Sequence, residues 1–524
     1  MKSLEQDVAT TLAMLRRRIN AHESPVYRLH PELLSLAASH LQNKYLFKAA
    51  QVSHRWRKTL LSFSSLWSDI HISWGRGHFT FLERSKSAPV NVFMGIPHYT
   101  SHAAATEFLN RHATKIETLT VVVHEDDIPR LLPPMPSLKK LDLSWDRTLS
   151  LRHRADEFTF PTVTTLTVRR GYAFPFNVPW LTRLQVHSEP ALSIIKLLDF
   201  LNACPFLEEL EVDYNEETER DHDTIDLPRL RLYSHSTSTD AHLCLFDKLS
   251  FPSSCSVVFN YWNGPSDLDR FYYEVLPFYN PSPLADIKRI NLKTDDDDAT
   301  VELIDAKNNR AYLVVYVGMS WQYPNVDRDI TESYVSYLES IDIHTVEVLC
   351  VRGPTIWDPD HAEDVLSCLG KIRTLVLSDP AAIPYIRALG LEFDNPDGDN
   401  TANGLLCPIL GTLVVHAWEF RNSRNEHILE RLPVVAQRRK DAGIPFKSVS
   451  LFIGCSWYEP EPVPMELLPA LEQLKECVEK FDMVVGDDAL DWNLDDYFFD
   501  GLDVRRDRHP FRDQRIRLRA YRWE

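Results

Sequence analysis

Residues 136–143 read PSLKKLDL, and this short stretch contains the pattern that decides the fold. Its apolar residues are Leu138, Leu141 and Leu143, in the order apolar-x-x-apolar-x-apolar. The same order recurs with anchors at Ile116, Leu138, Val163, Leu181, Leu207, Ile287, Val346, Ile372, Leu410 and Phe446, and in degenerate form near Leu230, Val257 and Leu313. The first six anchors, with Leu230 included, follow one another at intervals of about 18–26 residues, so the chain is built from repeats.

A proline occupies the same slot in many copies, two residues before the anchor. The prolines in this slot are Pro136, Pro161, Pro179, Pro205, Pro228 and Pro408. Proline suits the start of a strand but not its middle, because it has a fixed φ and no N–H donor. Each copy is therefore predicted to supply a short strand with inward apolar residues and a return segment. One copy cannot cover its own apolar side, so the copies are expected to stack into a curved parallel array of α/β class.

The repeat resembles the leucine-rich repeat, which runs about 20–29 residues and forms a solenoid with a parallel β-sheet on its concave face. The chain departs from the family in two ways. The Asn that normally follows the strand occurs only at Asn215, so the usual side-chain ladder is not expected. The later spacings are longer, and residues 295–345 read as an insertion that contains the acidic run 295–298 and a strand-like segment, 311–317.

Side chains alternate along a strand, so the residues between the apolar ones should face the concave surface. This rule assigns to the concave face Lys140, Asp142, Thr165, Thr167, Arg169, Arg183, Gln185, His187, Glu209, Glu211, Asp213, Arg289, Asn291, Lys293 and Arg352. Their mixed charge favours recognition of a target protein, with Lys140, Asp142, Arg169, Arg183, Glu209, Glu211, Asp213, Arg289, Asn291 and Lys293 as candidate contacts. The alternative for any one of them is a solvated position without a partner.

The first 75 residues carry helical rather than strand patterns. Leu4, Val8, Leu12, Leu15 and Ile19 predict an amphipathic helix within residues 1–24, either docked on the next domain or paired in a short coiled coil. Three short helices follow, and the first begins at Pro31, which suits an initial helical turn. Three such helices bury little apolar surface alone, so a partner is expected to stabilise them.

Residues 27–74 resemble an F-box of the kind found in large fungal families. The matching features are Leu29-x-Pro31-Glu32-Leu33, then the run 50–57 (AQVSHRWR), Ser65-Leu66-Trp67 and Ile70-x-Ile72. The resemblance implies docking to the adaptor of an SCF-type cullin–RING ubiquitin ligase. Carried over by position, the adaptor-binding residues would be Leu29, Pro31, Glu32, Leu33, Leu41, Val52 and Trp56. The chain departs at His30, Ala37 and Ser53, where the family usually has Pro, a larger aliphatic residue and Cys. A three-helix cap without an adaptor is the alternative.

The composition and the absence of known motifs argue against several other classes of function. The formal net charge of −18 disfavours nucleic acid and anionic membranes as partners. No secretory signal or bilayer-spanning apolar run is evident, so a cytoplasmic or nuclear location and free thiols are expected. No P-loop, GxGxxG or GxSxG motif occurs. The run 295–298 lacks the glycine and glutamate of a calcium loop, and His98 with His102 lacks a third ligand, so no cofactor or metal is predicted.

The C-terminal segment, residues 486–524, is acidic and aromatic before Arg505 and rich in arginine after it. A cap that closes the open end of the repeats is favoured over an RNA-binding tail. The domains predicted are therefore a helix in 1–24, an F-box in 25–75, repeats in 76–485 and this cap or tail. The expected function is a non-catalytic substrate receptor that links a target protein to the adaptor and, through it, to cullin. A ligase-independent repeat scaffold is the alternative, and an enzyme hidden in the insertion has no supporting motif.

Overall fold

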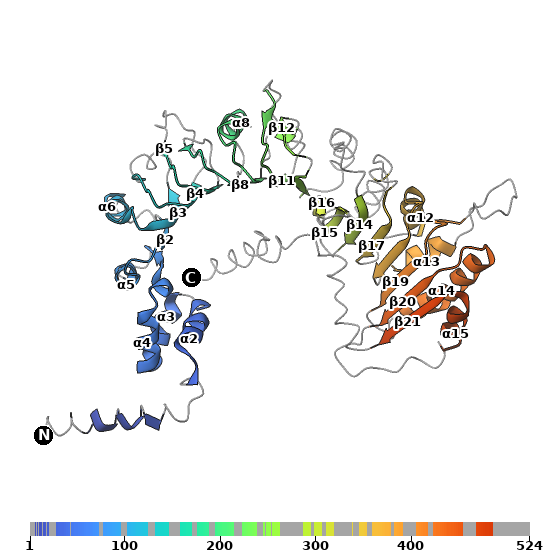
Figure 1. The fold of residues 1–524 in the computed structure, drawn as a ribbon, viewed down its shortest axis with the longest axis horizontal. Helices are drawn as coiled ribbons and strands as arrows, with labels where there is room; N and C mark the ends of the chain where they lie inside the picture. The colour runs from blue at the N-terminus through green and yellow to red at the C-terminus, as the bar shows by residue number, and fades with distance from the viewer. Residues whose placement is uncertain are drawn as a thin grey trace. The chain divides into compact units, whose positions relative to one another are not determined.

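In the computed structural model the chain forms two compact units, residues 1–207 and 208–524, each described here by itself (Figure 1). The described residues are scattered positions within 6–19, then 28–41, 43–72, 77–95, 102–123, 132–145, 158–169, 176–187, 194–213, 223–237, 245–246, 248–252, 254–261, 287–294, 298–305, 311–318, 338, 345–353, 359–378, 382–390, 405–417, 423–453 and 468–485. Among the described helices, none has the length and apolar character needed to cross a bilayer.

Unit 1 begins with the three predicted helices, α2 (Pro31–Ser39), α3 (Asn43–Val52) and α4 (His54–Ser62). Pro31 lies in the first turn of α2, as its missing N–H favours. Ser53 caps α4, because its hydroxyl oxygen accepts a 3.2 Å hydrogen bond from the Trp56 amide. The described residues within 6–19 are helical as well, and Val8, Leu12, Leu15 and Ile19 are exposed, so these side chains are not docked on the helices that follow.

An aromatic joint connects these helices to the sheet of unit 1. Trp67 lies in the short helix η2 (Ser64–Trp67), is completely buried, and donates a 2.9 Å hydrogen bond to the Leu60 carbonyl. The rings of Phe47 and Phe81 lie 5.6 and 5.1 Å from the Trp67 ring, and the Arg84 guanidinium lies 4.3 Å above it. The chain passes directly from η2 into strand β1 (Asp69–His71), so this joint fixes the helices to the first strand.

The sheet of unit 1 has the stacked parallel arrangement that the repeats predict. Its order is β1, β2 (Val90–Gly95), β3 (Ile116–Val123), β4 (Lys140–Trp145), β6 (Thr165–Arg169) and β8 (Arg183–His187), each parallel to its neighbour. The anchor residues and their apolar companions, such as Leu141 and Leu143, are buried behind it. The helices of this part are α5 (Gly77–Arg84), α6 (His102–His112) and α8 (Ile194–Asn202).

The proline slot coincides with a turn between two strands. Two-residue strands β5 (Phe158–Thr159) and β7 (Phe176–Asn177) pair in parallel, and Pro161 and Pro179 follow them. In unit 2 the strands β10 (Ile225–Asp226) and β12 (Leu249–Ser250) pair in the same way ahead of Pro228 and Pro252. Proline therefore ends a short outer strand and begins the turn into the main strand, where no amide donor is needed.

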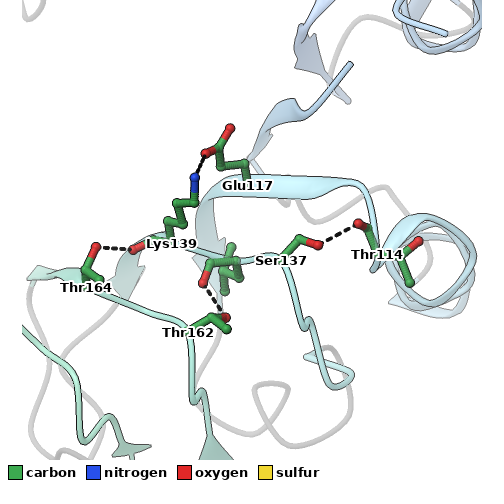
Figure 2. A network of polar contacts seen from close by, with 7 residues as sticks. Thr114, Glu117, Ser137, Lys139, Thr162 and Thr164 are labelled. Carbon is green, nitrogen blue, oxygen red and sulfur yellow. Dashed lines mark hydrogen bonds and ion pairs between the residues drawn. The ribbon is translucent and has the colours of Figure 1, made fainter. Parts of the chain in front are cut away.

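Hydroxyl and charged side chains connect successive copies where the main strands begin (Figure 2). Ser137 donates to the Thr114 carbonyl at 2.7 Å, and Thr162 donates to the Leu138 carbonyl at 2.8 Å. Lys139 pairs with Glu117 at 2.5 Å. Each of these bonds connects a residue next to an anchor with the preceding copy, so side chains as well as paired strands hold the copies together.

Unit 2 continues parallel pairing but includes one reversed strand. The order is β9 (Glu209–Asp213), β11 (Leu232–Thr237), β13 (Ser256–Tyr261), β16 (Ala311–Gly318), β15 (Asp298–Asp305), β14 (Ile287–Thr294) and β17 (Val348–Arg352). β15 is antiparallel to both β14 and β16. The strand-like segment 311–317 is thus confirmed as β16, and the expectation of a purely parallel sheet is wrong at this insertion. Of the acidic run, only Asp298 lies within the described residues, where it begins β15.

The last part of unit 2 alternates strands and helices in regular order. β17 is followed by α12 (Pro359–Cys368), β18 (Thr374–Ser378), α13 (Ala382–Gly390), β19 (Thr412–Ala417), α14 (Ser423–Asp441), β20 (Ser448–Ile453), α15 (Leu468–Cys477) and β21 (Lys480–Val485). The strands pair in parallel and the helices stand in a row along them (Figure 1). The described cysteines are free thiols, buried except for the half-buried Cys368: Cys204, Cys255, Cys350, Cys368, Cys407 and Cys477.

Candidate protein-docking surfaces

The first candidate surface lies on α2 and α3, where large apolar side chains point outward. Leu34 and Ala38 hold α2 to the module from its buried side. The opposite side of α2 exposes Leu33 and Leu36 at 52% and 59% of their surface. The three helices do not bury these residues themselves, so α2 has an exposed apolar side. We call this the helical docking surface, made of Leu29, Leu33, Leu36, Leu41, Tyr45 and Val52.

The sequence-predicted adaptor residues fall into two groups. Leu29, Pro31, Glu32, Leu33, Leu41 and Val52 are exposed on the module, Val52 most of all at 71%. Trp56 is half-buried in α4, so it supports the module and shows only part of its ring. Leu36 and Tyr45 were not among the predicted contacts, although both are exposed. The spacing of Leu33 and Leu36 at i and i+3 within α2 could have identified Leu36, because residues at this spacing share one side of a helix.

Polar contacts connect the ends of the helices that carry this surface. The carboxylate of Glu32 pairs with Nδ1 of His30 just before the helix begins. The guanidinium of Arg55 donates to the Leu29 carbonyl, and Nε of Arg57 donates to the Ala50 carbonyl at 3.1 Å. These bonds tie the ends of α2 and α3 to α4, so the exposed leucines are carried on a fixed backbone.

The second candidate surface is the front face of unit 1, formed by the outward side chains of its parallel strands. The predicted residues on this face are Lys140, Asp142, Thr165, Thr167, Arg169, Arg183, Gln185 and His187. All of them are exposed or half-buried except Thr167, which is buried. The Asp142 carboxylate accepts hydrogen bonds from Nε and Nη2 of Arg169 at 3.2 and 3.5 Å. The Thr167 hydroxyl donates a hydrogen bond to the side-chain oxygen of Gln185 at 3.1 Å. The alternation rule thus places these side chains together on one face.

An aromatic pair adds to this face and was missed by the sequence prediction. The rings of His71 and Phe93 stack at 4.6 Å on neighbouring strands β1 and β2. Burial lowers the pKa of His71, while the nearby Asp69 carboxylate acts in the opposite direction. Asp69 accepts a 2.7 Å hydrogen bond from Asn91. Phe93 stands at the alternate position of its strand, Val90-x-Val92-x-Met94, so the period-2 pattern could have placed it at the front.

In unit 2 the predicted contacts differ in exposure. Glu209, Glu211 and Asp213 on β9 are half-buried, as are Arg289 and Lys293 on β14 and Arg352 on β17. Asn291 is different, because it has no exposed surface and its amide donates to Glu302 at 2.9 Å. The expectation that Asn291 stands on an open face is wrong. The antiparallel strand β15 brings Glu302 directly beside Asn291 and helps to enclose it.

The front of β17–β20 is an apolar cluster rather than a charged surface. Cys350, Val376, Val414 and Phe452 are buried there together, with Val348 and Val484 packed against them. His416 is also buried at the front, and its ring stacks on that of Phe452 at 4.7 Å. Burial lowers the pKa of His416 to about 4, and the Arg352 charge acts in the same direction.

Because the pKa of His416 is lowered in the folded chain, we expect the stability of unit 2 to depend on pH. The unfolded chain binds a proton near pH 6.5, whereas folded His416 resists protonation down to about pH 4. The contribution of His416 is therefore fully present above pH 6.5 and is lost as the pH falls from 6.5 toward 4, by about 2 kcal/mol. Denaturant unfolding of the wild type and of His416→Gln across this range measures it. The variant should lose less stability on acidification, and equal slopes would contradict the assignment.

No protein-family model matches the chain, and no curated protein sequence matches it either. The described residues hold no group of three or more His, Cys, Asp or Glu side chains placed to share a metal ion. His98 and the segment from 486 onward lie outside the described residues, as does the side chain of His102.

Proposed function

We propose that the chain is the substrate-recognition subunit of an SCF-type ubiquitin ligase. In this role α2–α4 are an F-box that docks the adaptor through the helical docking surface. The parallel strands belong to a leucine-rich-repeat solenoid whose concave face binds a target protein. The exposed apolar side of α2 is the single observation that carries the proposal, because a module that only capped the repeats would turn that side inward.

The packing around Trp67 supports a receptor that holds its target at a fixed position relative to the adaptor. Its buried ring connects the helical module to β1, and β1 begins the sheet whose front face carries polar side chains. A target held at that face would therefore keep a fixed position relative to an adaptor held at α2. Ubiquitin transfer would then depend on proximity, with the chemistry supplied by other subunits, since linked sites raise the effective concentration of the target.

Binding of the adaptor should be lost when the helical docking surface is charged. Leu33→Asp places a carboxylate where the proposal buries a leucine, so we expect at least a ten-fold loss of affinity. The measurement is co-expression of the full chain with an SCF adaptor, followed by co-purification and titration. Val434→Asp is the matched control, because Val434 is also about half exposed but lies on α14 of unit 2.

Two results would contradict the proposal. One is that the wild-type chain does not co-purify with the adaptor. The other is that Leu33→Asp and Val434→Asp bind equally well. A ligase-independent scaffold predicts the first result together with retained binding to a target protein, so capture of the target by an adaptor-free chain would favour that alternative.

A further inference from the structure

The exposed side of α3 carries a lysine between two large apolar side chains. Tyr45, Lys48 and Val52 are all exposed and follow one another at i, i+3 and i+7, so they lie on one side of the helix. The opposite side is buried and includes Leu46 and Ala50. The Lys48 ammonium lies 5.5 Å from the centre of the Tyr45 ring, so its charge stands within the apolar stripe.

The charge of the helical module, residues 28–62, is opposite in sign to that of the whole chain. Glu32 is the single acidic residue in this stretch of sequence, and its carboxylate pairs with Nδ1 of His30. The same stretch contains six basic residues: Arg28, Lys44, Lys48, Arg55, Arg57 and Lys58. Six positive charges and one negative charge give +5, in a chain whose net charge is −18. A surface of this sign attracts a partner that carries carboxylates.

Lys48 differs from the other cations of the module in what it contacts. Within the described part of the chain its ammonium meets the Tyr45 ring but no carboxylate. Arg57, in contrast, has a role inside the module, because its Nε donates to the Ala50 carbonyl at 3.1 Å. Burying an ammonium against an apolar surface without a counter-charge is strongly unfavourable. A partner that covers Tyr45 and Val52 must therefore offer Lys48 a carboxylate, and a purely apolar partner is rejected.

We propose that the helical docking surface selects an acidic protein partner and that Lys48 determines this selectivity. The partner covers Tyr45 and Val52 with apolar groups and places an Asp or Glu carboxylate on the Lys48 ammonium. A nucleic acid fits less well, because its phosphates come without apolar groups for the flanking side chains. An anionic membrane would repel the acidic remainder of the chain. The inference rests on the adaptor docking proposed above and deepens it by naming the chemistry of the adaptor's surface.

The test is titration of the purified full chain with an SCF adaptor by biolayer interferometry. Lys48→Met keeps an apolar stem of similar length but removes the charge, so we expect a loss of affinity of about ten-fold or more. Lys48→Arg keeps the charge and should recover most of the affinity that Lys48→Met loses. Lys196→Met is the matched control, because it makes the same substitution at an exposed position of α8 in the same unit and should bind like the wild type.

Salt separates the ion pair from the apolar contacts around it. Salt screens charges but does not weaken apolar contact, so raising NaCl from about 50 to 500 mM should weaken adaptor binding by the wild type more than by Lys48→Met. Equal salt dependence of the two proteins would show that Lys48 meets no carboxylate in the complex, and the inference would be wrong.

A docking surface that recognises only apolar groups predicts the opposite result, because methionine would extend the apolar stripe of α3. Equal or tighter adaptor binding by Lys48→Met therefore overturns the inference, while adaptor docking itself stands. If the wild type does not bind the adaptor, the proposed function and this inference fail together. Binding to phosphatidylserine vesicles or to a single-stranded oligonucleotide that is lost in Lys48→Met would also overturn it, because the partner would then not be a protein.

Discussion

Replacing Arg439 with methionine should destabilise unit 2 by about 3–4 kcal/mol, more than an ordinary surface change. Arg439 lies in α14 with no exposed surface. Its guanidinium donates to the carbonyls of Leu406, Cys407 and Leu410 at 3.1, 3.0 and 3.2 Å. The variant leaves three buried carbonyl oxygens without these donors, and each costs about 1 kcal/mol or more.

The Arg439 guanidinium stabilises the turn at residues 406–410, whose backbone conformation is unfavourable by itself. Cys407 has a φ of +48°, a left-handed conformation that a non-glycine residue adopts only with support. The Arg439 guanidinium also lies 4.8 Å above the Phe446 ring, just before β20. Burial lowers the pKa of Arg439 to about 10, so it stays charged at neutral pH. Methionine recovers some apolar contact, which is why the expected loss stays below the sum of three carbonyls at their full cost.

Hydrogen exchange of residues 405–450 measures this effect locally, because a chain of two units need not unfold in one step. Arg431→Met is the control, since Arg431 is exposed on the same helix. The assignment fails if exchange in the turn 405–410 is equal in the two variants.

The repeat pattern predicted the strands because the inward positions of each strand must be apolar to be buried. Anchors such as Leu138 and Leu181 and their apolar companions are buried, and in the main sheet of unit 1 each strand pairs in parallel with its neighbour. The helices α2 and α4 were also predicted in place, since Pro31 and Ser53 mark helix starts by local chemistry. Prediction from sequence succeeded where the backbone preference of a residue, or the spacing of apolar residues, determines the structure by itself.

The front of unit 2 could not be predicted by the alternation rule alone. Strands β4 and β8 alternate polar and apolar residues, as Lys-Leu-Asp-Leu and Arg-Leu-Gln-Val. Strands β17, β18 and β19 instead contain unbroken apolar runs, Leu349–Val351, Leu375–Leu377 and Leu413–Val415. Such runs indicate a sheet buried on both faces. That signal was present in the sequence and points to the apolar cluster around Cys350 and Val376.

Other features depend on contacts between distant segments. β15 reverses direction between β14 and β16, and no local pattern specifies which strand it joins. Arg439 continues the buried stripe of α14 after Leu432 and Val435, yet a charged residue at that position is ordinarily assigned to solvent. Only the carbonyls brought near it by the turn at Cys407 make its burial favourable.

Replacing Trp67 with alanine should have the other large effect, a loss of about 3–5 kcal/mol in unit 1. The substitution removes a completely buried indole, its hydrogen bond to the Leu60 carbonyl and its packing against Phe47 and Phe81. It also leaves the Arg84 guanidinium without the ring beneath it. The cavity lies between α3, α4 and α5, and β1 follows Trp67 directly in the chain, so the helices should loosen from the first strand.

This variant separates the two parts of the proposed function. Hydrogen exchange should accelerate in residues 43–71 and stay unchanged in strands β6 and β8, whose parallel pairing does not involve Trp67. Adaptor capture should fall with it, because the exposed leucines of α2 are held only by the module behind them. Phe79→Ala is the control, since Phe79 lies nearby on α5 but is about half exposed. Normal adaptor capture and exchange in Trp67→Ala would mean that the helices hold their surface without the joint. Positioning of a target through β1 would then lose its physical basis.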